Sequence, residues 1–168
     1  MQPNNQVTIR SANDGDMAAI TRIYNQGIED RLATLETNPK TEQEVRDTFA
    51  GRAPRYALIV AERDGQIRGW ASLNPYSHRC AYDGVADLSV YVERSSRGAG
   101  IGRQLLEQLE KSARAGGFHK IVLFTFPSNQ AGQRLYRRMD FREVGIFREQ
   151  GTLDGHFVDV MAMEKILR

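Results

Sequence analysis

The sequence predicts an α/β domain in which a mixed, mostly antiparallel sheet is flanked by helices. Short β-branched runs alternate with segments whose apolar residues recur at helical spacing. A glycine-rich turn at residues 94–102 joins one such run to a helix, and the nearly continuous apolar run at 119–126 suits a strand covered on both faces. In chain order the pattern is β α α β β β α β α β β.

The N-terminal region supplies one strand and one helix. Residues 7–10 form the strand, and Asp14 or Asp16 could cap the helix that follows. One face of this helix is apolar and should pack on the core; it carries Met17, Ile20, Ile23, Tyr24, Gly27 and Ile28.

A loop, a second helix and a hairpin come next. Residues 31–41 contain an Asn-Pro pair that breaks any helix. Thr41 and Glu44 match the capping box and begin a helix that runs to about residue 51. The runs 56–62 and 66–73 are joined by Asp-Gly, which favours a tight hairpin turn.

The C-terminal half supplies the remaining elements. A polar and aromatic loop at 74–84 leads to a strand at 85–92. After the apolar strand at 119–126, Ser128 is a candidate N-cap for a helix with Ala131, Leu135 and Met139 on one face. The runs 142–148 and 156–166 complete the sheet.

The segment 85–117 combines a strand, a glycine-rich turn and an amphipathic helix. The turn glycines Gly98, Gly100 and Gly102 let the backbone approach a bulky group, and the free N–H groups of the helix start favour an anion. The helix carries its apolar residues at Ile101, Leu105, Leu106, Leu109 and Ala113. The turn matches neither a P-loop nor a dinucleotide fingerprint, because its basic residue leads an R-x-x-G-x-G string. A phosphate or pyrophosphate is the expected ligand.

Composition narrows the class of protein. With 168 residues, the chain is expected to form one domain over 1–168. The excess of 23 basic over 21 acidic residues is too small to indicate nucleic acid, and no apolar run predicts a membrane span or an export signal. The single Cys80 fits a reducing cytoplasm. The three histidines lack metal-ligand spacing, so no metal site is expected.

Strings along almost the whole chain resemble one family. IYNQGI, ETNPKT, WASLNPY, VADLSVYVE, RGAGIG and SNQAGQRLYRRMDFREVG are similar to segments of the GNAT superfamily of N-acetyltransferases, in its phosphinothricin and arsinothricin acetyltransferase branch. The resemblance implies the GNAT fold and acetyl-CoA as acetyl donor. It also implies that the pyrophosphate is held by Arg97, Gly98, Ala99, Gly100, Ile101, Gly102 and Arg103.

The resemblance also implies roles for residues around the reaction. Asp87 matches a carboxylate that accepts the amine proton directly or through water, although the branch commonly has Glu there; the alternative is a purely structural carboxylate. Tyr136 matches a tyrosine near the CoA sulfur that can protonate the thiolate, or it simply packs on its helix. Backbone amides of Val90, Tyr91 and Val92 and the side chain of Asn129 match contacts to the acetyl group and the pantetheine arm, with helix capping as the alternative for Asn129.

The acceptor is expected to be a small amino acid. Arg79 in the loop before the central strand is the candidate clamp for its carboxylate, against the alternative of a solvated surface arginine. Other candidates for the acceptor pocket are Tyr76, His78, Tyr82, Leu35, Glu36, Thr37 and Ser89. Leu35 stands where the phosphinothricin enzymes have an aromatic residue, which weakens the prediction of phosphinothricin itself.

Three functions remain open. The first is direct acetyl transfer to the α-amine of an amino acid or a toxic analogue: phosphinothricin, arsinothricin, methionine sulfone or methionine sulfoximine. The second is acetylation of a polyamine, an aminoglycoside or a protein N-terminus, and the third is an inactive acyl-CoA sensor. A covalent route through Cys80 would need a nearby base such as His78. The resemblance further implies a homodimer.

Overall fold

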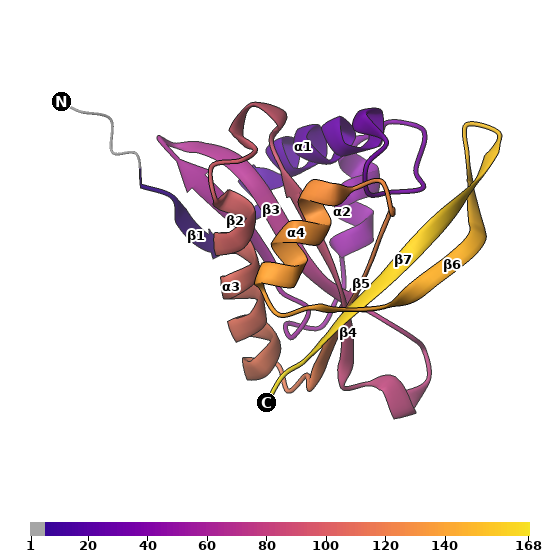
Figure 1. Cartoon of the computed structure of the whole chain (residues 1–168). Helices are drawn as coiled ribbons and strands as arrows, with labels where there is room; N and C mark the ends of the chain where they lie inside the picture. Colours follow the sequence, from indigo (N-terminus) through magenta and orange to yellow (C-terminus); the bar gives the residue numbers. More distant parts are fainter. Residues whose placement is uncertain (1–5) are drawn as a thin grey trace.

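One seven-stranded sheet organises the computed structural model, which describes residues 6–168 (Figure 1). The strand order is β1-β2-β3-β4-β5-β7-β6, and every pair is antiparallel except β4 with β5. The strands are β1 (Thr8–Ser11), β2 (Leu58–Arg63), β3 (Gln66–Pro75), β4 (Val85–Val92), β5 (Lys120–Thr125), β6 (Arg142–Leu153) and β7 (His156–Ile166). The helices are α1 (Met17–Asp30), α2 (Glu42–Phe49), α3 (Ile101–Ala115) and α4 (Gln130–Arg138). The predicted class and order of elements are confirmed.

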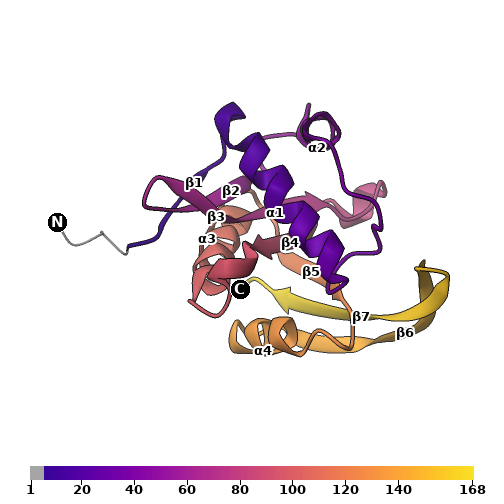
Figure 2. The ribbon, with the colours of Figure 1, turned by 90° about the horizontal axis from the view of Figure 1, so that it is seen from above.

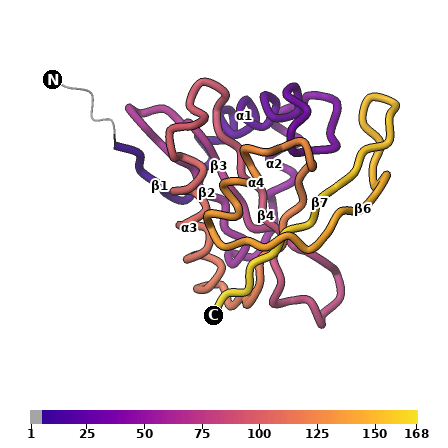
Figure 3. Tube along the Cα trace, viewed as in Figure 1, coloured from indigo at the N-terminus to yellow at the C-terminus, as the bar shows by residue number. Residues whose placement is uncertain are grey.

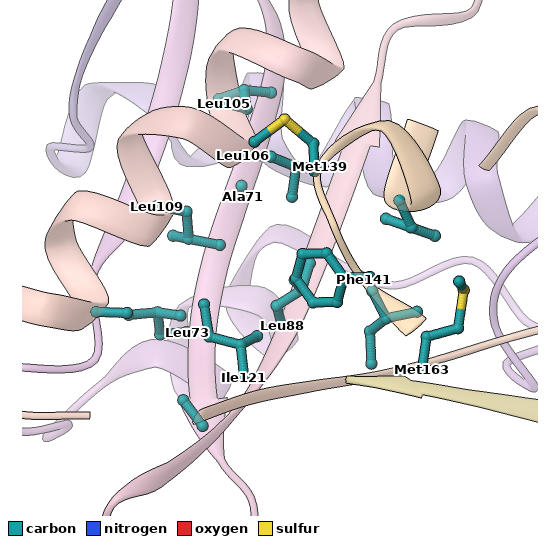
Figure 4. Close-up of a cluster of buried hydrophobic side chains, with 14 of the residues drawn as sticks. Ala71, Leu73, Leu88, Leu105, Leu106, Leu109, Ile121, Met139, Phe141 and Met163 are labelled. Carbon is teal, nitrogen blue, oxygen red and sulfur yellow. The ribbon is translucent and has the colours of Figure 1, made fainter. Parts of the chain in front are cut away.

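The two faces of the sheet are covered by different helices, α1 and α2 on one side and α3 and α4 on the other (Figure 2). Because side chains alternate along a strand, β3 and β4 contribute to both faces. Ala71, Leu73 and Leu88 pack with the buried leucines of α3 and with Met139 and Phe141 (Figure 4). Trp70 packs on the opposite side with residues of α1 and α2.

The central strands β4 and β5 separate after a short parallel pairing. Their backbone register covers only Val85 to Asp87, opposite Lys120 to Val122. Beyond that point β4 continues to pair with β3, and β5 with β7. The backbone groups of residues 88–91 on the β5 side therefore have no strand partner and are open to a ligand, whereas the carbonyl oxygen of Val92 accepts a hydrogen bond from Arg97.

Two helix caps differ from the prediction. Neither Asp14 nor Asp16 caps α1 with its side chain: Asn13 caps a short 3-10 turn ahead of the helix, and Asp16 pairs with Arg10 instead. Ser128 does not cap α4, because the Asn129 side chain accepts the hydrogen bond from the Gly132 amide.

The buried face of α4 also differs from the prediction. Gln133 and Tyr136 are buried, whereas Ala131 is exposed and Leu135 is half-buried. Of the three apolar positions predicted for this face, only Met139, at the C-cap of α4, is buried.

The β6–β7 hairpin extends away from the helices, as the Cα trace shows in orange and yellow (Figure 3). The predicted Asp64-Gly65 turn between β2 and β3 is present, with both residues at positive φ. Within residues 6–168, no helix has the length and apolar character needed to cross a bilayer.

Candidate active site

The turn between β4 and α3 leaves the first backbone amides of the helix without a side-chain cap. Gly98 and Gly100 adopt φ of +78° and +83°, which favours glycine, and Gly100 stands at the N-cap of α3. Gly102 faces Leu135, and an added Cβ would lie 3.0 Å from its Cδ2. The uncapped N–H groups and the helix dipole make this turn suited to a phosphate group.

Arginines flank this turn, and each has a carboxylate partner. Arg97 pairs with Asp30 at 2.7 Å and donates from Nε to the carbonyl oxygen of Val92. Arg94 shares the same Asp30 carboxylate, and hydrogen bonds from Arg94 and then Arg97 lower the pKa of Asp30. Arg103 is exposed and pairs with Glu107 one turn along α3. Asp30 therefore holds two cations beside the start of α3.

A cleft of about 290 Å³ occupies the gap where β4 and β5 separate. It brings together residues from six parts of the chain: Tyr24, Ala33, Thr34, Leu35, Asp87, Leu88, Ser89, Val90, Tyr91, Phe124, Thr125, Phe126, Tyr136 and Val160. Six of the predicted site residues are thus in one place: Asp87, Tyr136, Val90, Tyr91, Leu35 and Ser89. Val92 instead packs against the core under α3.

Asp87 lies at the closed end of this cleft, at the last position at which β4 pairs with β5. Desolvation raises the pKa of its carboxyl to about 6, against hydrogen bonds from Asn74 and the Leu88 amide and the charge of Arg52. A carboxylate with a pKa near neutral is well placed to accept a proton at physiological pH.

A second cavity of about 300 Å³ lies on the α1 and α2 side of the sheet. Tyr24, Ser89 and Tyr91 line both cavities, so the two are neighbours. The other residues lining the second cavity are Glu36, Lys40, Glu44, Val45, Thr48, Phe49, Arg52, Trp70, Ser72 and Asn74.

Sequence reasoning missed the polar residues Arg52, Ser72 and Asn74. The signal for Ser72 and Asn74 was present, because they fall on the same face of β3 as Trp70, directly opposite Ser89 and Asp87 of β4. Arg52 gave no signal, since it lies in an irregular segment between α2 and β2.

The loop before β4 places its predicted residues unevenly. Tyr76 and Tyr82 line an open hollow of about 380 Å³ together with Asp87. Arg79 and His78 are exposed and line none of the three hollows. Cys80 is also exposed. Glu36 lines the second cavity and forms an ion pair with Lys40.

The model of the acetyltransferase (GNAT) family matches residues 19–141, which include the turn, Asp87 and every residue of the cleft except Val160. The chain belongs to the GNAT family. Phosphinothricin N-acetyltransferase of Streptomyces viridochromogenes is 34% identical over 92% of this chain and 84% of its own length. The L-methionine sulfoximine/L-methionine sulfone acetyltransferase of Pseudomonas paraeruginosa is 31% identical over 94% of this chain and 92% of its own length.

Solved structures share the fold closely. A GNAT superfamily phosphinothricin acetyltransferase from Sinorhizobium meliloti in complex with AcCoA has a TM-score of 0.89 at 28% identity, covering 96% of this chain and 88% of that one. A ribosomal-protein-alanine N-acetyltransferase from Brucella melitensis has a TM-score of 0.91 at 33% identity, covering 95% and 99%. The protein is an acetyl-CoA-dependent N-acetyltransferase.

The residues of this GNAT chain fit acetyl-CoA. The turn before α3 offers uncapped amides to a pyrophosphate, and the free edge of β4 offers hydrogen bonds to an amide-bearing arm. Acetyl-CoA supplies the acetyl group as a thioester. The side chain of Asn129, by contrast, is engaged in the protein itself: it accepts from Gly132 and donates to Thr125.

Tyr136 of the GNAT site is buried, and its side chain lines the cleft. Desolvation and the charge of Asp87 raise the pKa of its hydroxyl to about 12, so the proton is retained at neutral pH. We expect Tyr136→Phe to lower kcat about 100-fold with both Michaelis constants unchanged, because only proton donation is removed. Steady-state kinetics measure this effect. Tyr56→Phe, which alters a tyrosine outside the cleft, should keep the wild-type kcat; equal rates in Tyr136→Phe and wild type would exclude the acid role.

Glu93 directly follows β4, just before the glycine-rich turn, and is buried between two arginines. Its carboxylate lies 2.6 Å from Arg22 and 2.7 Å from Arg68. Desolvation opposes its charge, but the hydrogen bonds from Arg68 and Arg22 prevail and hold the pKa of Glu93 at about 2. The depressed pKa means that this carboxylate stabilises the fold fully above its ordinary pKa and loses that contribution as the pH falls towards 2.

We therefore expect Glu93→Gln to lower the free energy of unfolding at pH 7 by about 1 to 3 kcal/mol, with a smaller loss at pH 3. Urea unfolding at the two pH values measures this difference. Glu107→Gln, which breaks the exposed pair with Arg103, should change stability by less than about 0.5 kcal/mol. A loss that is the same at both pH values would contradict the role of the charge.

Proposed function

We propose that the enzyme transfers the acetyl group to the α-amine of a small amino acid or a toxic analogue of one. The acceptors envisaged are phosphinothricin, arsinothricin, methionine sulfone and methionine sulfoximine. The observation that carries the proposal is the position of Asp87, a base with a pKa of about 6 that lines both the cleft between β4 and β5 and the open hollow of Tyr76 and Tyr82. A second cavity of about 300 Å³ beside it has room for a small amino acid.

The proposed reaction is direct transfer within a ternary complex. Asp87 accepts a proton from the acceptor's ammonium group, directly or through water, which leaves an amine able to attack the thioester carbonyl. Backbone N–H groups on the free edge of β4, around Val90, stabilise the negative charge that develops on the carbonyl oxygen. As the carbon–sulfur bond breaks, Tyr136 donates its proton to the departing thiolate, and the second proton lost by the attacking nitrogen restores the tyrosine hydroxyl.

Acetylation of a protein N-terminus is the second candidate, favoured by the fold shared with the Brucella ribosomal-protein-alanine acetyltransferase. A peptide acceptor needs an open groove for the residues after the first. The hollow lined by Tyr76 and Tyr82 is the open surface next to Asp87 that would have to receive them.

A thiol-release assay with acetyl-CoA and a panel of acceptors tests the proposal. The panel contains phosphinothricin, arsinothricin, methionine sulfone, methionine sulfoximine, a polyamine, an aminoglycoside and a peptide with an N-terminal alanine. Turnover confined to the amino-acid analogues is the expected result. Turnover of the peptide alone would favour the second candidate, and coenzyme A binding without any turnover would favour a sensor.

The proposed assembly is a homodimer, and the proposed location is the cytoplasm, where an exposed thiol such as Cys80 stays reduced. The β6–β7 hairpin supports the dimer, because β6 is an edge strand and Val144, Phe147 and Phe157 are exposed on the hairpin, Phe157 at 71%.

We expect light scattering to give twice the mass of one chain, and Phe157→Asp to give a monomer. Lys111→Asp, which alters an exposed residue of α3, should stay dimeric; a monomeric wild type would contradict the assembly.

A further inference from the structure

Arg52 is a half-buried cation that lines the second cavity without a carboxylate partner. No ion pair within 4.0 Å joins it to an acidic side chain among residues 6–168, whereas Lys40 in the same cavity is paired with Glu36 at 2.9 Å. Its guanidinium lies 4.8 Å from the centre of the Phe49 ring. Desolvation lowers the pKa of Arg52, and the charge of Asp87 opposes that shift. A partly buried cation without an anionic partner favours the binding of an anion in the cavity.

Asn74 connects Arg52 to Asp87, and its amide has only one chemically reasonable orientation. Arg52 donates from Nη1 to Oδ1 of Asn74 at 2.7 Å, and Ser72 donates to the same oxygen at 2.9 Å. Since a guanidinium only donates, the oxygen must face it, and Nδ2 must face the other way. Nδ2 lies 3.0 Å from Oγ of Ser89 and 3.4 Å from Oδ2 of Asp87. One asparagine side chain thus separates a fixed positive charge from the candidate base.

This arrangement complements the charges of an α-amino acid, in which one carbon separates the carboxylate from the amine. Arg52 uses one of its five N–H donors on Asn74, and the others remain for a ligand. We propose that Arg52 binds the carboxylate of the acceptor in the second cavity, so that the acceptor's amine is directed toward Asp87. This inference rests on the proposed function and replaces Arg79 as the clamp, because Arg79 lines none of the hollows.

Trp70 provides a direct readout of binding. It is the single tryptophan of the chain and lines the same cavity as Arg52. With saturating coenzyme A, Trp70 fluorescence is followed during titration with L-methionine sulfone and with its carboxamide, which lacks the negative charge. We expect the wild type to bind the carboxylate form more tightly by on the order of 10- to 100-fold.

Variants of three arginines separate the possible anchors. Arg52→Gln should weaken binding of methionine sulfone on the order of 10- to 100-fold and abolish the preference over the carboxamide, and Arg52→Lys should restore part of both. The control Arg55→Gln alters an arginine that pairs with Asp83 and lines none of the three hollows described above, and should leave both affinities unchanged. Arg79→Gln should also leave them unchanged.

Three outcomes would contradict the proposal that Arg52 binds the acceptor carboxylate. The first is a preference for the carboxylate form that survives in Arg52→Gln or is lost only in Arg79→Gln. An Arg52→Gln variant with altered kcat and pH profile but unchanged affinity would show that Arg52 acts only through Asn74. A wild type without carboxylate preference would contradict the anchor even if the variants misfold. If the preference is observed but no amino acid is acetylated, the proposed function fails while the anchor stands.

Discussion

Asp87→Asn is expected to lower kcat about 100- to 1,000-fold while leaving the Michaelis constant for acetyl-CoA unchanged. The substitution keeps the size of the side chain and removes its ability to accept the ammonium proton. Because the carboxyl has a pKa of about 6, only its deprotonated form above that pH is active, so the wild-type kcat/KM should fall with decreasing pH below about 6. This acidic limb should be absent from the residual activity of the variant.

The same variant should be more stable than the wild type, which separates loss of chemistry from loss of fold. Burial raises the pKa of Asp87 from 3.8 to about 6, so the charged carboxylate is less favourable in the folded state than in the unfolded chain. The native protein binds more protons than the unfolded chain between these pKa values, and stability falls as the pH rises through them. Asp87→Asn should therefore gain about 1 to 3 kcal/mol at pH 7 in urea unfolding.

Asp83→Asn serves as the control, since Asp83 is an exposed carboxylate just before β4 that pairs with Arg55. It should retain the wild-type kcat and acidic limb. An Asp87→Asn enzyme that keeps both would show that another group accepts the proton.

Gly100→Leu is expected to raise the Michaelis constant for acetyl-CoA at least about tenfold, because the side chain would enter the space that the pyrophosphate needs. Gly100 has φ of +83° and no neighbour within 4 Å of an added Cβ, so the turn itself leaves this space open. The left-handed conformation should also cost about 1 to 2 kcal/mol of stability.

Gly117→Leu is a matched control at the other end of α3. Gly117 has φ of +79° and equally open surroundings, so the loss of stability should be similar. Its Michaelis constant for acetyl-CoA should remain that of the wild type. Equal Michaelis constants in the two variants would remove the pyrophosphate site from this turn.

The elements that could be predicted are those in which local pattern and tertiary environment agree. The apolar positions of α3, from Ile101 to Ala113, are all buried as their spacing predicts, and Thr41 and Glu44 form the predicted capping box. Both features depend on contacts within a few residues, which the sequence displays directly. The Asp64-Gly65 hairpin belongs to the same class.

What could not be predicted depends on contacts between distant segments. The separation of β4 and β5 follows from the different partners that each strand finds, β3 and β7, and no residue type marks it. Arg52 reaches Asn74 only because the segment between α2 and β2 meets the end of β3 in space. Ser128 and Asn129 are both good capping residues, and only the path of the chain after β5 selects Asn129. The place of His78 in the acceptor pocket stays a prediction, and the Arg52 proposal is the alternative to a clamp by Arg79.

The short pairing of β4 with β5 also has a mechanical meaning. Within residues 6–168, the pairing of Val85–Asp87 with Lys120–Val122 is the only strand pairing that joins β1-β2-β3-β4 to β5-β7-β6. The two halves of the sheet are therefore connected through three residue pairs. The pantetheine arm of acetyl-CoA, hydrogen-bonded along the free edge of β4, would take the place of the missing strand pairing between β4 and β5. Amide hydrogens of β4 and β5 should then exchange more slowly once acetyl-CoA is bound, because the enzyme without acetyl-CoA opens more readily between these two strands.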